Sequence, residues 1–169
     1  MERSFEELFS NLKLDRDLTN ALEGATVSRV STNHSRTGMR IYLEIKTLVP
    51  KRRIWKLEDE IKRQCFPKEE LRIHIIESFS LSSLYTPEKL YEAYRDSILE
   101  EIDAYSSLLL GVYKKADFDF SKEGYLNVVL EDTVVAREYE QVLHDILHKI
   151  FWDRCHQKVM IDFSYKEPK

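Results

Sequence analysis

The chain has 169 residues, of which 43% are hydrophobic and 33% are charged, which is enough for one domain or two small ones. Glycine and proline are scarce, with four of each, and this excludes long disordered linkers. The formal net charge of -4 does not favour a domain specialised for nucleic acid, although it leaves room for a local basic patch.

The N-terminal segment, residues 1–24, is predicted to be helical. Ser4 is placed to cap a first helix with Glu7 as its capping-box partner, and apolar residues from Phe5 to Leu12 follow at helical spacing. A second short helix is expected from Asp17 to Leu22.

Residues 25–79 have the pattern of a ββαβ unit. A strand is expected at 25–31, and after a turn the alternation of apolar and polar residues from Met39 to Lys46 predicts a second strand. Pro50 suits the first turn of a helix, whose apolar residues Ile54, Leu57 and Ile61 share one face. Alternation resumes at Leu71 and predicts the last strand of the unit.

Residues 80–115 are predicted to form a helical connector. Thr86 is a suitable N-cap and Pro87 suits the first helical position. One apolar stripe then follows, which we expect to pack between the units on either side. Its members are Leu90, Tyr91, Tyr94, Ile98, Ile102 and Tyr105.

Residues 116–169 repeat the order strand, strand, helix, strand. With an offset of 86 residues, Leu57 falls on Leu143 and Ile75 falls on Ile161. This is a weak internal repeat of pattern rather than of identity. The sequence therefore predicts an α+β fold of two small ββαβ units, joined by the helical connector and preceded by the N-terminal helices.

Residues with metal-binding or redox chemistry do not form a recognisable motif. His144 and His148 are four apart on a helix, but the glutamate of an HExxH zinc motif is missing. Cys65 and Cys155 fit no CxxC or zinc spacing, so both are expected to be buried free thiols. No phosphate-binding loop or nucleophile motif is present, and we expect no catalytic residue, no metal and no cofactor.

The N-terminal sequence MERSFEELF is acidic and has no apolar segment of the kind that secretion signals carry. No apolar run reaches the length of a membrane span. We therefore expect a cytoplasmic protein that has no contact with membranes.

Two charged surfaces are candidate binding sites. The basic helix cluster lies on the helix after Pro50, where cations around an aromatic side chain are typical of single-strand DNA contacts. It consists of Lys51, Arg52, Arg53, Trp55, Lys56 and Lys62. The acidic helix face lies on the connector helix and is a candidate surface for a protein partner. It consists of Glu92, Asp96, Glu100 and Asp103. Charges on either surface are also compatible with a simply solvated helix.

Several long stretches of the sequence resemble the N-terminal region of PolC-type DNA polymerase III alpha subunits from Gram-positive bacteria. They are RIYLEIKTLVPKRRIWKLEDEIKRQCFP, LSSLYTPEKLYEAYRDSILEEI, YSSLLLGVYKKAD and LEDTVVAREYEQVLHDILHKIFWDRC. They occur in the same order as in that family, and the resemblance extends from about Phe5 to Tyr165.

The resemblance implies a parent polymerase that adds deoxynucleotides to a primer and also carries a 3′–5′ exonuclease. This chain resembles only its first, non-catalytic region, and nothing in it matches the catalytic carboxylates or histidines of later domains. The region is also similar to the domain by which the tau subunit of the clamp loader binds the polymerase. The resemblance therefore implies contacts with replisome proteins, such as a tau-type subunit, and with the rest of the polymerase chain. Single-stranded DNA bound by the basic helix cluster is the alternative.

Overall fold

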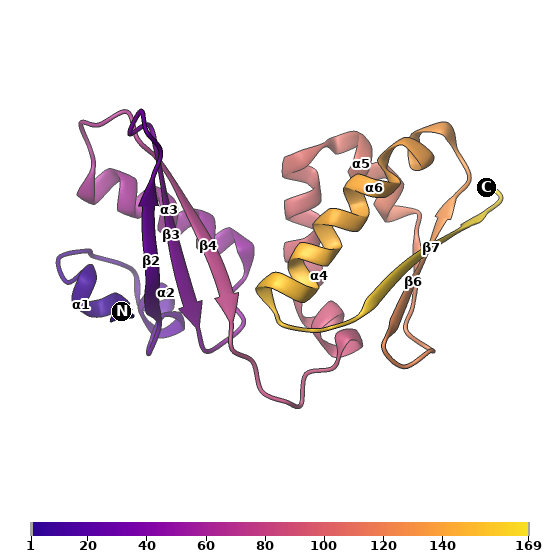
Figure 1. Ribbon diagram of the computed structural model, residues 1–169, viewed down its shortest axis with the longest axis horizontal. Helices are drawn as coiled ribbons and strands as arrows, with labels where there is room; N and C mark the ends of the chain where they lie inside the picture. Colours follow the sequence, from indigo (N-terminus) through magenta and orange to yellow (C-terminus); the bar gives the residue numbers. More distant parts are fainter. Residues whose placement is uncertain (1, 169) are drawn as a thin grey trace. The chain divides into compact units, whose positions relative to one another are not determined.

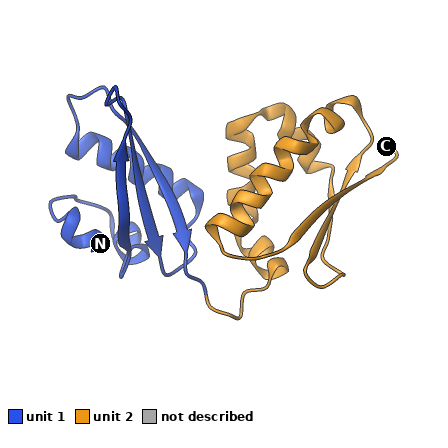
Figure 2. Ribbon diagram, in the orientation of Figure 1, with its two compact units in different colours: residues 1–81 blue, residues 82–169 orange. Residues whose placement is uncertain are grey.

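The computed structural model describes residues 2–168, and the chain divides into two compact units, residues 1–81 and 82–169 (Figure 2). Each unit has its own small sheet with helices packed on it (Figure 1). The predicted α+β class with two small ββαβ units is therefore confirmed. The N-terminal helices belong to the first unit, and residues 82–115 of the expected connector belong to the second.

The first unit contains a four-stranded sheet in the order β1-β2-β3-β4. Its strands are β1 (Arg3–Ser4), β2 (Thr26–Thr32), β3 (Gly38–Ile45) and β4 (Arg72–Phe79). The pairs β1–β2 and β2–β3 are antiparallel, whereas β3 and β4 are parallel. The parallel pair requires a crossover connection, which helix α3 (Lys51–Cys65) provides.

The first N-terminal helix is shorter than predicted, whereas the second has the predicted length and begins one residue earlier. Helix α1 (Phe5–Leu8) is a single turn, and helix α2 (Arg16–Ala21) is capped by Asp15, whose Oδ1 accepts a 2.8 Å hydrogen bond from the Leu18 N–H. The predicted capping box at Ser4 is wrong, because the Ser4 side chain makes no capping hydrogen bond. Ser4 is instead a strand residue, paired in β1 with β2.

The core of the first unit lies between the sheet and α3. Ile41 of β3 and Ile75 of β4 point to it and are 0% and 1% exposed. Helix α3 contributes Ile54, Leu57 and Ile61, the apolar face predicted from the sequence. Full burial of each such side chain stabilises the fold by about 1.5–3 kcal/mol. Because side chains alternate along a strand, the neighbours of the core residues point to the opposite face of the sheet.

The second unit contains a three-stranded sheet in the order β5-β6-β7, with β5–β6 antiparallel and β6–β7 parallel. Its strands are β5 (Asp117–Asp119), β6 (Tyr125–Glu131) and β7 (Met160–Lys166). Its helices are α4 (Pro87–Tyr105), α5 (Ser107–Lys114), α6 (Val134–His148) and the π-helix η1 (Lys149–Arg154), which continues α6.

Helix α4 begins where the sequence predicted, with the Thr86 hydroxyl accepting a hydrogen bond from the Lys89 N–H at 3.2 Å. Its apolar stripe packs within the second unit, except for Tyr105 at the end of the helix, which is exposed. Tyr91 packs against Phe118 of β5 with ring centroids 4.8 Å apart, and its hydroxyl shares a 3.0 Å hydrogen bond with that of Tyr113 on α5. The helix expected to connect two units is thus part of the core of one of them.

The two sheets have matching registers in their parallel pairs. Ile41 lies opposite Ile75 in the first sheet, and Leu126 lies opposite Ile161 in the second. Superposing these pairs equates β3 with β6, β4 with β7 and β2 with β5. The residue numbers differ by 85 between Ile41 and Leu126 and by 86 between Ile75 and Ile161. The weak repeat of sequence pattern is therefore a repeat of topology.

Candidate functional site

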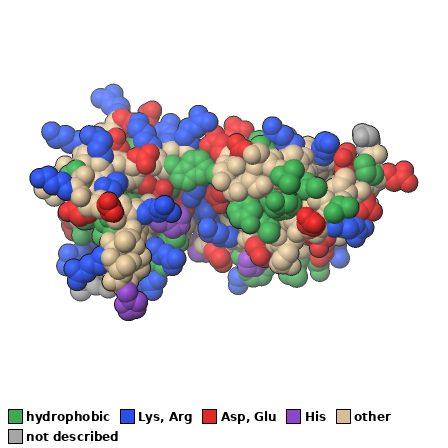
Figure 3. Space-filling view, turned by 90° about the horizontal axis from the view of Figure 1, so that it is seen from above, with side chains coloured by type: hydrophobic (Ala, Val, Ile, Leu, Met, Phe, Trp, Pro, Cys, Tyr) green, Lys and Arg blue, Asp and Glu red, His purple; other side chains and the backbone are tan. Residues whose placement is uncertain are grey.

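The surfaces of the two units differ in kind. Figure 3 shows Lys and Arg side chains gathered over the first unit and a hydrophobic area over the second. The described residues contain no group of three or more His, Cys, Asp or Glu side chains arranged to hold a metal ion.

The basic helix cluster does not converge on one surface. Lys51 is only 4% exposed, and its Nζ lies 3.0 Å from Oε2 of Glu77 on β4. The same Nζ lies 5.9 Å from the ring centroid of the half-buried Trp55. Lys51 therefore belongs to a buried ion pair, and its ammonium group is directed at a carboxylate of its own unit.

Carboxylates next to α2 meet two further members of the cluster. Lys56 donates a hydrogen bond to Asp15, and this bond lowers the pKa of the Asp15 carboxyl. Arg53 lies 3.8 Å from Asp17. The unit's own carboxylates thus offset much of the positive charge that the sequence suggested on this helix.

The other two cations of the cluster point elsewhere. Arg52 is exposed, whereas Lys62 is half-buried near the end of α3 and donates a 2.5 Å hydrogen bond to the Phe66 carbonyl. The sequence could not reveal the acidic partners, because they lie far from α3 along the chain. Binding of single-stranded DNA by this cluster stays a prediction.

The acidic helix face lies along α4 in the second unit. Glu92, Asp96 and Asp103 are exposed, and Glu100 is half-buried. No salt bridge or hydrogen bond involves the side chains of the three exposed residues within residues 2–168. The neighbouring Glu101, by contrast, binds the buried Arg154 guanidinium at 2.7 Å.

The two histidines of α6 form a stack. The His144 and His148 rings are stacked with centroids 5.9 Å apart, and His148 also stacks on Trp152 at 5.0 Å. Of the two free cysteines, Cys155 is buried as predicted, whereas Cys65 is exposed. Cys65 is the last residue of α3 and lies one turn beyond Ile61, the last buried residue of the helix.

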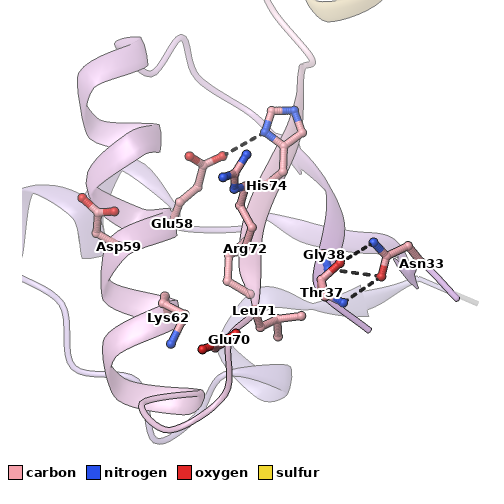
Figure 4. A pocket seen from close by; sticks show the side chains of 11 residues that line it. Asn33, Thr37, Gly38, Glu58, Asp59, Lys62, Glu70, Leu71, Arg72 and His74 are labelled. Atoms are coloured by element: carbon pink, nitrogen blue, oxygen red, sulfur yellow. Dashed lines mark hydrogen bonds and ion pairs between the residues drawn. The ribbon is translucent and has the colours of Figure 1, made fainter. Parts of the chain in front are cut away.

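A pocket of about 950 Å³ opens in the first unit, between α3 and the start of β4 (Figure 4). Oε2 of Glu58 on α3 accepts a 2.7 Å hydrogen bond from the Ile75 N–H and lies 3.5 Å from Nδ1 of His74. On the other side, the Asn33 side chain accepts from the N–H groups of Thr37 and Gly38 at 2.9 and 3.2 Å and so fixes the β2–β3 turn.

A second hollow of about 430 Å³ shares Asn33, Gly38, Arg72 and His74 with this pocket. It opens on the side of the sheet opposite α3, which we call the basic sheet face. This face is formed by Arg29, Ser31, Arg40, Tyr42, Glu44, Arg72, His74 and Ile76. It was not among the surfaces predicted from the sequence.

Arg29 reaches the basic sheet face because of a β-bulge. The register of β2 against β3 shifts between Val27 and Arg29, so that Arg29 lies opposite Tyr42. Its guanidinium carbon lies 4.2 Å from the Tyr42 ring centroid, and its hydrogen bonding lowers the pKa of the Tyr42 hydroxyl. Strict alternation from Val27 would have placed Arg29 on the buried face, which is why the sequence pattern missed it.

Residues 4–75 match the family model described as DNA polymerase III polC-type N-terminus I. Over these residues the first unit is similar to this family. The match runs from β1 into β4 and covers nearly all of the first unit, which we call the N-terminus I domain. The second unit lies outside the match. The predicted resemblance to the N-terminal region of PolC-type polymerases is confirmed for the N-terminus I domain.

Neither the comparison with curated proteins nor the comparison with solved structures gave a match.

Within residues 2–168, every helix is too short or too polar to cross a membrane.

Proposed function

We propose that the chain is the N-terminal accessory region of a PolC-type DNA polymerase III, and that its second unit binds a protein partner through the acidic helix face. The family match of the N-terminus I domain supports the first part of this proposal. The unpaired carboxylates of Glu92, Asp96 and Asp103 are the observation that carries the second.

These carboxylates are spaced so that they repel one another within the free chain. Glu92 and Asp96 are four residues apart, and like charges at this spacing destabilise a helix by about 0.2–0.5 kcal/mol per pair. A partner with a basic surface would offset this repulsion and would be drawn to the face by charge complementarity.

A tau-type subunit of the clamp loader is the partner that we propose, on the strength of the sequence resemblance. Other replisome proteins and the remainder of the polymerase chain are the alternative occupants of the face. In this proposal the protein is cytoplasmic, and the polymerase and exonuclease activities belong to other domains of the parent. A nucleotide-incorporation assay on this chain alone should accordingly show no product.

The test is a titration of the chain with a tau-type subunit by isothermal calorimetry. Reversing the three exposed charges (Glu92→Lys, Asp96→Lys and Asp103→Lys) should weaken binding at least tenfold. The matched control reverses three exposed, unpaired carboxylates elsewhere in the same unit (Glu123→Lys, Glu138→Lys and Asp153→Lys) and should bind like the parent chain. Equal loss in both variants would remove the acidic helix face from consideration, and no binding by the parent chain would exclude this partner.

A further inference from the structure

We infer that the basic sheet face of the N-terminus I domain binds single-stranded nucleic acid. This inference concerns a different unit and a different class of ligand from the protein contact proposed above, so either can fail without the other. It also names a different surface from the basic helix cluster, which lies on the opposite side of the sheet.

Three arginines of this face stand on a diagonal across the sheet. Arg29 on β2 lies opposite Tyr42, Arg40 on β3 lies one row further along, and Arg72 on β4 lies one row beyond that, opposite Gly38. Strands lie about 4.8 Å apart and alternate residues about 6.6 Å apart, so neighbouring arginines on the diagonal are about 8 Å from each other at the backbone. The diagonal forms a track of positive charge suited to a flexible chain of phosphates.

The three guanidinium groups have no carboxylate partner. Arg29, Arg40 and Arg72 are all exposed, and none of them forms a salt bridge within residues 2–168. This distinguishes the basic sheet face from α3, where Asp15, Asp17 and Glu77 take up positive charge. An incoming anion would therefore meet three guanidinium groups that no carboxylate pairs with. The one carboxylate of the face, Glu44, lies on β3 beyond Tyr42, at the end of the diagonal away from Arg72.

Aromatic stacking on this face favours nucleic acid over an acidic peptide. The Arg29 guanidinium is held over the Tyr42 ring, and a guanidinium plane in this position can stack on a nucleobase. His74 adds a second planar ring beside Arg40, and both line the hollow of about 430 Å³. Phosphate contacts on the diagonal and base stacking at Arg29 together define a single-strand site.

A broad sheet surface also favours a single strand over a duplex. Duplex DNA is commonly read by a helix or β-ribbon that enters the major groove. On the basic sheet face the three strands β2, β3 and β4 lie side by side, and α3 packs on the other side. Such a surface exposes planar groups to splayed bases, as single-strand RNA-binding sheets do.

The experiment is fluorescence anisotropy of a labelled oligothymidylate titrated with the full chain at several salt concentrations. The variant Arg29→Gln, Arg40→Gln, Arg72→Gln should bind more weakly, and its slope of log K against log salt should be shallower by about 2, since each lost phosphate contact removes about 0.7. The matched control Arg52→Gln, Arg53→Gln, Lys56→Gln changes the net charge equally and should keep the slope of the parent chain.

Two further measurements separate nucleic acid from other polyanions. Arg29→Lys keeps the charge but removes the planar group, so it should lower affinity while leaving the salt slope unchanged. Polyglutamate at equal charge concentration should not displace the oligonucleotide.

The inference is overturned if the parent chain does not bind, if the triple variant keeps the parent slope, or if polyglutamate competes as well as unlabelled oligothymidylate. The last result would identify the face as a site for acidic protein segments. Because all three arginines are exposed, thermal unfolding of the variants should match that of the parent chain, which excludes misfolding as the cause of a loss.

Discussion

The exposed faces of the two sheets hold the same place in the same topology, yet they carry opposite charge. Tyr42 and Asn127 correspond because they follow the equivalent buried residues Ile41 and Leu126. Arg29 lies opposite Tyr42 and Asp119 lies opposite Asn127, so Arg29 of the first unit corresponds to Asp119 of the second. On the edge strand, Ile76 corresponds in the same way to Asp162. Positions that are basic or neutral in one unit are thus acidic in the other.

The inner faces show no such divergence at the positions that pack against the helices. Ile41, Leu43 and Ile75 correspond to Leu126, Val128 and Ile161, and all are buried and apolar. Core positions must keep their apolar character for the unit to fold, whereas the exposed face of a sheet is free to change. The repeat therefore preserves the apolar scaffold, and the two units differ on the faces that the scaffold leaves exposed.

One position on the inner face of the first sheet is not apolar, and a change there should cause the largest loss of stability. Glu77 corresponds to Phe163 and is held by the buried Lys51. Lys51→Met should lower the free energy of unfolding of the first unit by about 3–5 kcal/mol, because it leaves a buried carboxylate without its ion-pair partner. Urea unfolding followed by Trp55 fluorescence in a Trp152→Phe background would measure this.

The double variant Lys51→Met, Glu77→Leu is the control for that prediction. It makes the first unit apolar at this position like the second, and it should recover most of the lost stability. A single variant as stable as the parent chain would mean that the pair contributes nothing to the fold.

A core truncation in each unit should have the next largest effect. Ile41→Ala and Leu126→Ala remove corresponding side chains that are both 0% exposed, and each should cost about 2–5 kcal/mol. Trp55 reports on the first unit and Trp152 on the second. We expect Ile41→Ala to shift the Trp55 transition and Leu126→Ala to shift the Trp152 transition. A shift of both transitions by either variant would show that the units unfold together.

Transfer of charge between the exposed faces should have a smaller effect. Asp119→Arg with Tyr125→Arg places arginines at the positions that correspond to Arg29 and Arg40. If the diagonal of charge is sufficient for phosphate contacts, the salt slope of oligothymidylate binding should steepen by about 1.4. An unchanged slope would indicate that binding needs the bulge and the Tyr42 stack as well as the charge.

The smallest effect is a difference between two tyrosines. The Arg29 hydrogen bond lowers the pKa of Tyr42, whereas burial, followed by the hydrogen bond to Glu140, raises the pKa of Tyr165 to about 12. As pH rises above 10, Tyr42 should therefore ionise before Tyr165. Because folding raises the pKa of Tyr165, the stability it contributes is present below pH 10 and declines as pH approaches 12.

Absorbance titration at 295 nm of Tyr42→Phe and Tyr165→Phe would measure this difference. The ionisation step that Tyr42→Phe removes should lie at a lower pH than the step that Tyr165→Phe removes. Coincident transitions would contradict the hydrogen bonding of Arg29 to the Tyr42 hydroxyl in solution.

Local sequence patterns predicted the elements well but not the partners of the charged side chains. Alternation from Met39 to Ile45 gave β3, and Thr86 with Pro87 gave the start of α4, because these signals act within a few residues. The pairing of Lys51 with Glu77 joins residues 26 apart, and that of Lys56 with Asp15 joins residues 41 apart. No local pattern encodes such distances, so the basic helix cluster looked more positive in the sequence than it is in the fold.

The bulge in β2 makes a different surface more positive in the fold than the sequence suggested. It moved Arg29 from the face that alternation assigns to it onto the exposed side, where it joins Arg40. Sequence reasoning identified a hairpin at this place, yet a one-residue change in register decides which side chains share a face. The candidate site in the N-terminus I domain therefore depends on a feature that only the three-dimensional structure displays.

The hydrogen bond from Ile75 to Glu58 also bears on self-association. Strand β4 ends its sheet, and an edge strand offers N–H groups to which a strand of another molecule can add. The Glu58 carboxylate accepts one of these N–H groups and places a negative charge beside the edge. A helix residue of the crossover thus occupies an N–H group of the edge strand and puts a charge beside it, and both features oppose the addition of a strand from another molecule.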